Sequence, residues 1–292
     1  MRTNKLLLVD GNNLLYRAYF SHSGLSSFGG QKLNAIFGFL NILAAAIRRF
    51  KLDECIVCWD GKRDANRMKL HPEYKGDRKQ KITMDPEDLH QQKDIIKKLL
   101  HLLGVKQIVN KDKEADDLIY IVQRRKRKEK PVIILSSDKD FDQLVRSNVF
   151  IWNDKIGQMI TVENMPRVKG YKPSQCVDYL SLLGDKSDNI PGYRGMGPVK
   201  VKQFMDKYGS IAKYLLDGEP FSGVNALVMS ELQFRNAALI DLKWHYNMYH
   251  RQLKLVYYKT KTPILQEKEY IKLAASLGLR QFREEKFINI FK

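Results

Sequence analysis

The sequence predicts an α/β fold built on a parallel-rich central sheet flanked by helices. Three apolar runs carry this prediction, and each leads into an aspartate: residues 5–9 before Asp10, 55–59 before Asp60, and 132–135 before Asp138. Continuous apolar runs of this length are typical of strands buried on both faces, as in a parallel sheet. Helical patterns alternate with these runs, which is typical of βαβ units.

The elements are expected in the following order. Residues 5–60 predict a strand, a loop, a helix and a second strand; the apolar segment 35–47 in this stretch is too short to span a bilayer and indicates a core helix. A helix is expected over 85–104, because Asp85-Pro86 is a typical N-cap with a first-turn proline and Gly104 a typical end. A strand at 106–109, a helix at 114–125 and the strand at 132–135 follow. A hairpin turn is expected at 153–158.

Strand signals mostly cease after about residue 167, where helical patterns with glycine-rich connections take over. We therefore expect two parts packed together without a linker. The first is an α/β domain at 1–167, which includes a basic segment and the helix after it at about 62–104. The second is a helical region at 168–292.

The chain is strongly basic. Its 292 residues contain 51 Lys and Arg against 33 Asp and Glu, for a formal net charge of +18. This charge fits a polyanionic partner, and nucleic acid is favoured over a membrane surface because no basic amphipathic anchor is evident. The basic run at 124–130 is interpreted as a solvated helix end, where cations favour the carboxyl terminus.

The three cysteines cannot build a disulfide framework, so a reducing compartment is expected. Cys55 and Cys58 have the C-x-x-C spacing of metal and redox sites. On a strand, however, an offset of three points the two side chains to opposite faces, which indicates buried structural thiols. The apolar run before Asp10 is too short for a signal peptide. A soluble, cytoplasmic, monomeric protein is expected.

Acidic side chains gather at the predicted strand ends, at helix starts and in one tight loop. They are Asp10, Asp60, Glu114, Asp116, Asp117, Asp138, Asp140, Asp185 and Asp188. The carboxyl ends of parallel strands are where open α/β sheets bind ligands, and converging carboxylates cannot all stay ionised without cations. Oxygen ligands without His or Cys partners favour Mg²⁺ or Mn²⁺ over zinc, and enough carboxylates for two ions indicates a two-metal phosphoryl site.

Four segments carry a resemblance to a known family: Leu-Val-Asp-Gly-Asn-Asn at 8–13, Glu-Ala-Asp-Asp at 114–117, Ser-Asp-Lys-Asp at 137–140 and Gly-Asp-Lys-Ser-Asp-Asn-Ile-Pro-Gly at 184–192. In this order they resemble the 5′-nuclease family, which contains flap endonucleases, phage 5′→3′ exonucleases and the N-terminal nuclease domain of bacterial DNA polymerase I. With segment 71–78 the chain is most similar to the free-standing phage flap endonucleases. The resemblance implies a PIN-like 5′-nuclease fold with a helical arch and a helix–three-turn–helix element at about 180–207.

The resemblance also implies a ligand set for two Mg²⁺ or Mn²⁺ ions. The first ion would be held by Asp60, Glu114 and Asp116, supported by Asp10. The second would be held by Asp138, Asp140 and Asp185, with Asp188 acting through water. Asp117 belongs to the same motif and is included as a metal residue.

Two basic elements complete the implied site. At the base of the arch, Lys75 and Arg78 would contact the scissile phosphate, Tyr74 would stack on a base, and Arg67 would be a further DNA contact. In the helix–three-turn–helix element, backbone amides would grip duplex phosphates without reading bases, and a bound K⁺ is plausible there. Its candidate DNA contacts are Gly195, Gly197, Lys200 and Lys202.

We therefore expect a metal-dependent 5′ nuclease that cuts branched DNA near the junction and trims 5′ ends. Its substrates would be flaps, nicks and RNA–DNA primers, in the cytoplasm of a bacterium or a phage-infected host. Two alternatives stay open. One is a PIN-like ribonuclease, although the arch segment and the glycine hairpin argue against it. The other is a non-catalytic protein that binds branched DNA.

Overall fold

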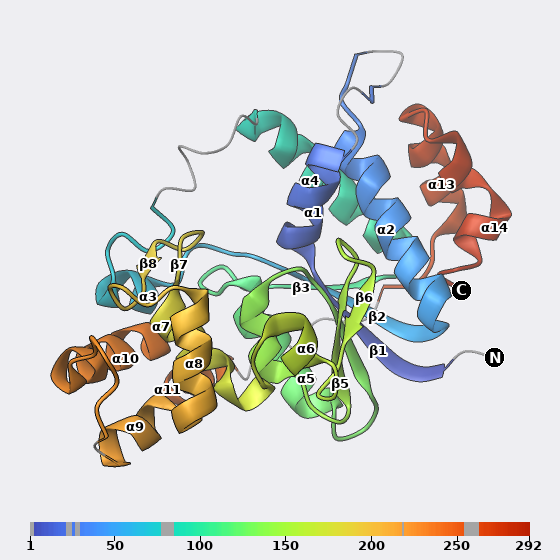
Figure 1. The fold of residues 1–292 in the computed structure, drawn as a ribbon. Coiled ribbons are helices and arrows are strands. Elements are labelled where there is room, and N and C mark those ends of the chain that lie inside the picture. The colour runs from blue at the N-terminus through green and yellow to red at the C-terminus, as the bar shows by residue number, and fades with distance from the viewer. Residues whose placement is uncertain (1–2, 22–24, 27–29, 77–84, 218, 254–262) are drawn as a thin grey trace.

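A six-stranded sheet forms the centre of the computed structural model, which describes residues 3–21, 25–26, 30–76, 85–217, 219–253 and 263–292 (Figure 1). The strands lie in the order β3-β2-β1-β4-β5-β6. They are β1 (Thr3–Asp10), β2 (Leu52–Trp59), β3 (Lys106–Val109), β4 (Val132–Leu135), β5 (Val149–Asn153) and β6 (Gln158–Ile160). Neighbouring strands are parallel except β5 and β6, which form the predicted hairpin. The predicted fold class is confirmed.

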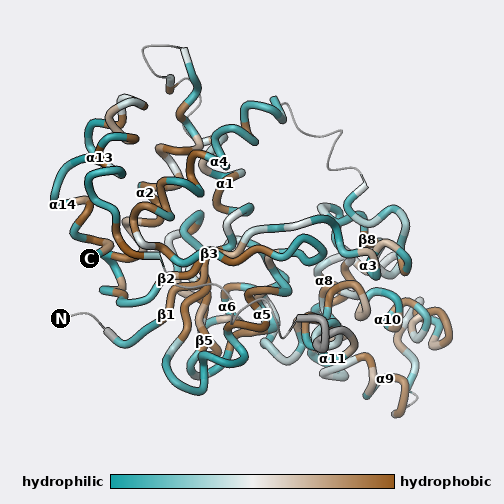
Figure 2. The backbone as a smooth tube through the Cα atoms, turned by 180° about the vertical axis from the view of Figure 1, so that it is seen from behind, coloured by the Kyte–Doolittle hydropathy of each residue, from teal (hydrophilic) through white to brown (hydrophobic). Residues whose placement is uncertain are grey.

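Successive side chains of the central strands enter two different hydrophobic cores, which explains their continuous apolar runs. In β1, Leu6 and Leu8 belong to one core, whereas Leu7 and Val9 belong to the other, and all four are fully buried. Figure 2 shows these strands as the hydrophobic centre of the molecule. The free thiols follow the same alternation, since Cys58 lies in the first core and Cys55 packs against the second.

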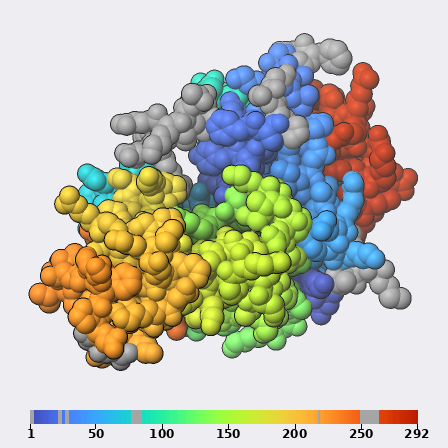
Figure 3. Space-filling model, in the orientation of Figure 1, coloured from blue at the N-terminus to red at the C-terminus, as the bar shows by residue number. Residues whose placement is uncertain are grey.

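Each core is covered by its own set of helices. The core that contains Leu7 is covered by α1 (Gly11–Ser21), α2 (Asn34–Phe50) and α4 (Pro86–Leu102). The core that contains Leu6 is covered by α5 (Ala115–Lys126), α6 (Met165–Lys169), α7 (Cys176–Leu183), α8 (Pro198–Tyr208) and α10 (Ala226–Ile240). The helical region therefore extends one core of the sheet, and Figure 3 shows its yellow and orange surface directly against the green α/β part.

Short elements connect these helices. They are α3 (Ala65–Leu70), the 3-10 turns η2 (Lys139–Leu144) and η3 (Pro173–Gln175), the two-stranded hairpin β7 (Gly184–Asp185) and β8 (Ile190–Pro191), α9 (Ile211–Asp217) and α11 (Leu242–Leu253). The sequence α7, hairpin, α8 occupies the range predicted for the helix–three-turn–helix element. No helix in the described ranges is long and apolar enough to cross a membrane.

The last thirty residues of the helical region return to the α/β part. They form α13 (Glu267–Ser276), the 3-10 turn η4 (Arg280–Arg283) and α14 (Glu285–Ile288). The ring of Phe282 lies 5.3 Å from that of Phe37 in α2, and Gln266 N donates to Leu102 O at 2.8 Å. Their apolar side chains bury into the core of Leu7, so residues 263–292 pack against the first domain.

The predicted arch segment at about 62–104 is described at both of its ends. Asp64 caps α3 and Asp85 caps α4, and each side chain accepts two backbone N–H bonds. Residues 77–84, which include Arg78, lie outside the described residues.

Candidate active site

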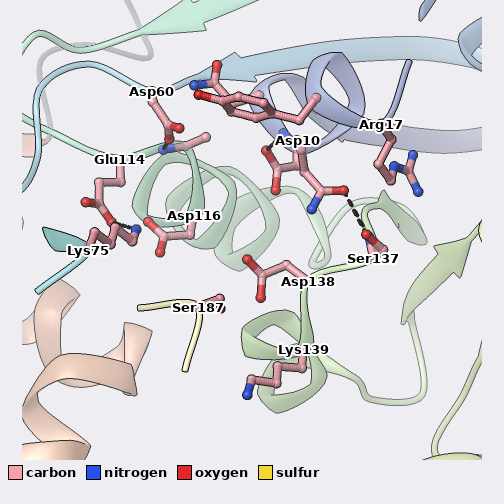
Figure 4. A pocket seen from close by; sticks show the side chains of 14 residues that line it. Asp10, Arg17, Asp60, Lys75, Glu114, Asp116, Ser137, Asp138, Lys139 and Ser187 are labelled. Carbon is pink, nitrogen blue, oxygen red and sulfur yellow. Dashed lines mark hydrogen bonds and ion pairs between the residues drawn. The ribbon is translucent and has the colours of Figure 1, made fainter. Parts of the chain in front are cut away.

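The pocket lies where the connections of the sheet change direction. From β1 the chain builds β2 and β3 on one side, whereas β4 is followed by β5 and β6 on the other. Open α/β sheets bind ligands outside the carboxyl ends of their strands at such a point. A pocket of about 630 Å³ lies there, and its lining includes five predicted acids: Asp10, Asp60, Glu114, Asp116 and Asp138. In Figure 4 the side chains of Asp10, Asp116 and Asp138 point into the same space.

Hydrogen bonds from backbone N–H groups orient three of these carboxylates. Asp10 ends β1 and accepts from Asn13 N at 3.1 Å. Asp60 follows β2 and accepts from Ala115 N at 2.7 Å. Asp138 follows β4 as the N-cap of η2 and accepts from Asp140 N at 3.0 Å. Each acid therefore lies at a strand end; Asp10 and Asp138 are fixed by the turn that follows them, whereas Asp60 is fixed by the first residue of α5.

The acidic side chains repel one another in this site. Burial raises the pKa of Asp10 to about 7, and the nearby Asp60 and Asp138 add to the effect. Burial also raises the pKa of Asp138 and of Asp140, and for Asp140 the neighbouring carboxylates add strongly. Cations bound among these groups would remove the repulsion.

A second group of acids adjoins the pocket. Asp140, Asp185 and Asp188 each offer a carboxylate oxygen, and the three oxygens lie within 4.8 Å of one another. The Oδ1 atom of Asp140 is buried without a hydrogen-bond partner among the described residues. Burial raises the pKa of Asp185, but hydrogen bonds from Ser187 and the Lys139 ammonium outweigh it, so this pKa lies below its ordinary value.

These donors fit hard divalent cations. Every one of them is a carboxylate oxygen, which Mg²⁺ and Mn²⁺ prefer. The partnerless oxygen of Asp140 is an acceptor that a cation would satisfy. Asp188 stands in the same group as Asp140 and Asp185, although the sequence predicted for it only a contact through water.

Lys75 reaches the first acidic group from the base of the arch. Its Nζ lies 2.6 Å from Glu114 Oε2 and 3.7 Å from Asp188 Oδ2, and the side chain lines the pocket. Burial raises the pKa of Glu114, but Lys75 and Arg67 outweigh it and lower this pKa to about 2. Lys75 is thus placed as a cation between both acidic groups.

Tyr74 does not fill the role expected of it. The side chain is only 2% exposed and its hydroxyl donates to Glu114 at 3.1 Å. The prediction that Tyr74 stacks on a base is wrong, because the ring is part of the hydrophobic core. Its position instead orients the carboxylate of Glu114.

Arg67 and Asp117 form a buried pair behind the pocket. Arg67, 1% exposed, donates from Nη1 and Nη2 to Asp117 at 3.1 and 3.0 Å, from Nη1 to Glu114 at 3.2 Å, and from Nε to Leu239 O at 3.2 Å. A guanidinium with these partners is not available to DNA, so the prediction of a DNA contact is wrong for Arg67. Asp117 is engaged by the same guanidinium and does not line the pocket, which argues against a metal ligand. The pair supports Glu114 and Asp116 from behind.

The arch base is locked to the loop that carries Asp185 and Asp188. Lys75 N donates to Asp188 O at 2.9 Å, and Asn189 Nδ2 donates to Glu73 O at 3.1 Å. The Nε2 atom of His71 lies 2.7 Å from Asn189 O. Lys75 and Asn189 both have positive φ, 56° and 58°, which an L residue adopts only under local constraint. The two segments thus hold each other in the site.

The candidate DNA contacts of the helix–three-turn–helix element lie on the surface. Gly195 has φ +82°, and Gly197 caps α8 without a side-chain hydrogen bond. A Cβ at either glycine would meet no atom within 4 Å, so the backbone there is open to a ligand. Lys200 is exposed on the first turn of α8, and Lys202 pairs with Asp206 at 2.6 Å.

The structure adds pocket residues that the sequence reasoning missed. Asn13, Tyr16 and Arg17 line the pocket from one face of α1. The signal was present, because positions i, i+3 and i+4 after the strand-ending Asp10 share a helix face. Lys139 and Ser187, which stand between predicted ligands in the sequence, also line the pocket.

Comparisons with known proteins match nearly the whole chain. Residues 5–171 match the family model of the 5′-3′ exonuclease N-terminal resolvase-like domain, and residues 171–275 match that of the 5′-3′ exonuclease C-terminal SAM fold. A 5′-3′ exonuclease of Aquifex aeolicus is 33% identical over 83% of this chain and 80% of its own length. DNA polymerase I of Thermus aquaticus is 33% identical over 72% of this chain, but this match spans only 25% of the polymerase.

Solved structures share the fold at lower identity. The bacteriophage T5 flap endonuclease in a complex with DNA and metal ions is 20% identical, with a TM-score of 0.68 and 99% of each chain covered. The catalytic core of Rad2 in complex with DNA substrate is 15% identical, with a TM-score of 0.61 over 99% of this chain and 93% of its own.

Proposed function

The chain belongs to the 5′-3′ exonuclease family, and from this premise we propose that it is a structure-specific 5′ nuclease that hydrolyses DNA phosphodiesters at flaps and 5′ ends. The observation that carries the proposal is the convergence of two acidic groups at the switch point of the sheet, with Lys75 between them. Scattered solubilising acids would not share one buried site with raised pKa values.

Two divalent ions, Mg²⁺ or Mn²⁺, would be held in this site. One would be held by Asp10, Asp60, Glu114 and Asp116. The other would be held by Asp138, Asp140, Asp185 and Asp188. When bound, such ions supply an activated water and charge stabilisation for an in-line displacement at phosphorus.

The side chains of the protein prepare the site for this chemistry. Tyr74 and Arg67 fix Glu114 from the core, so the carboxylate needs little reorganisation when a ligand arrives. Lys75 pairs with Glu114 in the free protein. When substrate binds, the Lys75 ammonium would pair with a phosphate oxygen instead, and Arg78 in the arch would add a second cation. Ser137 Oγ donates to Asn13 Oδ1 at 3.1 Å, and both residues line the pocket; Figure 4 shows Ser137 near Arg17.

DNA would be held mainly through its backbone. The open amides around Gly195 and Gly197 and the ammonium of Lys200 suit duplex phosphates, and K⁺ at this turn would strengthen the contact. The T5 and Rad2 structures are complexes with DNA, which supports a DNA substrate. We propose that this substrate is branched or 5′-ended, RNA–DNA primers included. Binding should weaken steeply with salt and ignore sequence. The three free cysteines fit the reducing cytoplasm of a bacterium or a phage-infected cell, where we place the reaction, carried out by a monomer.

The test is cleavage of a 5′-labelled flap with and without Mg²⁺. Wild type should release labelled flap fragments only with Mg²⁺, whereas Asp138→Asn and Asp185→Asn should bind the flap and leave it uncut. Asp53→Asn is the matched control, because Asp53 is exposed at the opposite end of β2 from Asp60 and should cleave as wild type.

Other outcomes would assign another function. Cleavage of RNA alone would indicate a PIN-like ribonuclease, and a mobility shift without cleavage would indicate a protein that only binds branched DNA. Full activity in a double Asp138→Asn and Asp185→Asn variant would contradict the two-metal account.

Lys75 can be tested separately. Lys75→Ala should slow single-turnover cleavage by about 10²-fold or more, since a preorganised charge at the reacting phosphate is lost, while flap affinity changes little. Equal single-turnover rates would remove Lys75 from the mechanism.

A further inference from the structure

A second basic feature lies at the far end of α5 from the active site. The helix begins at Ala115, beside Glu114, and its 12 residues place its ends about 18 Å apart at about 1.5 Å per residue. At the far end is a hollow of about 570 Å³, lined by Arg124, Arg125, Arg127, Lys128 and Tyr246. Tyr246 comes from α11, which packs beside α5 (Figure 2).

A solvated helix end explains only part of this feature. Within the run, Lys126 pairs with Glu129 at 3.1 Å and Lys130 pairs with Glu54 at 3.0 Å, as expected of solvated surface cations. In the described ranges no carboxylate pairs with Arg124 or Arg127. Their charge is therefore left unbalanced.

A third arginine joins them from another part of the chain. Arg146 lies between η2 and β5, and its Nε donates to Leu144 O at 3.2 Å. Burial lowers the pKa of Arg146, and the charges of Arg127 and Arg124 lower it further; no carboxylate is among the groups that act on it. A helix terminus does not require this convergence. We call Arg124, Arg127 and Arg146 the arginine cluster.

The cluster is held in place, but among the described residues no carboxylate pairs with it. The guanidinium of Arg124 lies over the ring of Tyr246, 4.9 Å from its centre, and Nη1 donates to the Tyr120 hydroxyl at 3.4 Å. The backbone carbonyl of Arg127 accepts from Asn148 Nδ2. The Nε atom of Arg127 is nevertheless buried with no hydrogen-bond partner in the described part of the chain. Buried donors in native proteins normally have one.

We propose that the arginine cluster binds a phosphate group, and that the backbone of the bound DNA supplies it. Guanidinium groups form bidentate, charge-assisted hydrogen bonds with phosphate, which would satisfy Arg127 Nε and relieve the repulsion around Arg146. The choice of DNA as the source rests on the proposed nuclease function, whereas the anion chemistry rests on the cluster alone. Because α11 belongs to the helical region, this site would lengthen the DNA-contacting surface beyond the reach of the metal pocket.

The geometry sets a length requirement that can be measured. A duplex advances about 3.4 Å per base pair, so about 18 Å corresponds to about five base pairs as a lower limit. Affinity is measured by fluorescence anisotropy in EDTA, which prevents metal-dependent cleavage, on DNA whose two arms are lengthened separately. Wild type should gain affinity when one arm exceeds this limit. Arg127→Gln and Arg146→Gln should lose about tenfold on the long arm only, with a salt slope lower by about one.

Two variants control for charge and fold. Arg48→Gln removes an exposed arginine from the last turn of α2 and should bind both lengths as wild type. Arg127→Lys keeps the charge but not the fork, and should recover only part of the affinity. Melting temperatures of ligand-free Arg127→Gln and Arg146→Gln should equal or exceed that of wild type, because repulsion is removed.

A second experiment, with free phosphate, distinguishes the two sources of the bound phosphate group. Tripolyphosphate should raise the melting temperature of wild type and of Arg48→Gln more than that of Arg127→Gln. If the arginine variants differ from wild type only with tripolyphosphate, the site takes free phosphates instead of DNA. If they match wild type with both DNA and tripolyphosphate, the proposal is wrong. A wild type that fails to cut DNA would refute the nuclease function, and the tripolyphosphate experiment would still decide whether the arginine cluster binds anions.

Discussion

Asp10→Asn should change how the stability of the metal-free protein depends on pH. The pKa of Asp10 is raised from 3.8 to about 7, chiefly by burial and then by the charges of Asp60 and Asp138. A difference of about three pH units, at about 1.36 kcal/mol each, corresponds to about 4 kcal/mol of unfolding free energy. Asparagine keeps the shape and can still accept from Asn13 N and contact Ser136.

The direction of the pH effect on stability follows from the raised pKa of Asp10. Because the folded protein holds this proton more tightly than the unfolded chain, the contribution of Asp10 is fully present below pH 3.8 and is lost as pH rises through about 7. Metal-free wild type should therefore lose up to about 4 kcal/mol relative to Asp10→Asn between about pH 4 and pH 8. Groups that do not interact with Asp10 titrate alike in both proteins and cancel in the difference.

The assay is urea unfolding in EDTA at a series of pH values. Asp53→Asn, at the exposed start of β2, should follow the wild-type pH dependence. Saturating Mg²⁺ should flatten the wild-type curve, since bound cations keep the carboxylate ionised, and should stabilise Asp10→Asn less. Parallel curves for Asp10→Asn and wild type in EDTA would refute the account of a crowded, proton-sharing site.

Three further outcomes are expected. Arg67→Ala should destabilise the protein by about 3–5 kcal/mol, because Asp117 becomes a buried unpaired charge. Adding Asp117→Ala should recover part of this loss. Simple additivity of the two unfolding free energies in urea would contradict the pairing. Tyr74→Phe should lower the free energy of unfolding by about 0.5–1.5 kcal/mol, because the hydroxyl that donates to Glu114 is lost. The affinity for single-stranded DNA, measured by anisotropy, should stay unchanged. A loss of that affinity would restore a stacking role for Tyr74. Gly192→Ala should lower the melting temperature and the Mg²⁺ affinity, because a Cβ would lie 2.4 Å from the Leu183 carbonyl carbon. Gly197→Ala, where a Cβ would enter open space, should melt as wild type. Equal melting temperatures for the two variants would contradict the tight hairpin.

The fold and the acidic positions were predictable because both depend on local patterns. A buried strand requires a run of apolar residues, and its carboxyl end has a fixed place in a parallel sheet. Asp10, Asp60 and Asp138 could therefore be located from the strands before them. Their convergence with Glu114, which caps α5 after the parallel strand β3, follows from the same topology.

Partnerships between distant side chains were not predictable. Nothing in the local sequence distinguishes a solvent-facing arginine from Arg67, whose partners lie 47, 50 and 172 residues away. Nothing in the local sequence distinguishes Asp142 from a solvated acid either, yet it is fully buried and accepts from Lys169 and Tyr171. The return of 263–292 to the first domain was missed for a related reason, since an amphipathic pattern does not specify which core receives it.

The hydrogen bond from Arg67 to Leu239 O ties the acidic site to the end of α10, in the part of the chain that follows residue 171. The acceptor is a main-chain carbonyl, which every amino acid provides. The bond to Arg67 therefore sets no requirement on the side chain at 239, which is buried in the core for its own packing, but it does fix the placement of that helix end. Chimaeras that join parts of two relatives at residue 171 should fold and be active only where the end of α10 lies so that the carbonyl at 239 can accept from Arg67, whatever the overall identity of the two parts.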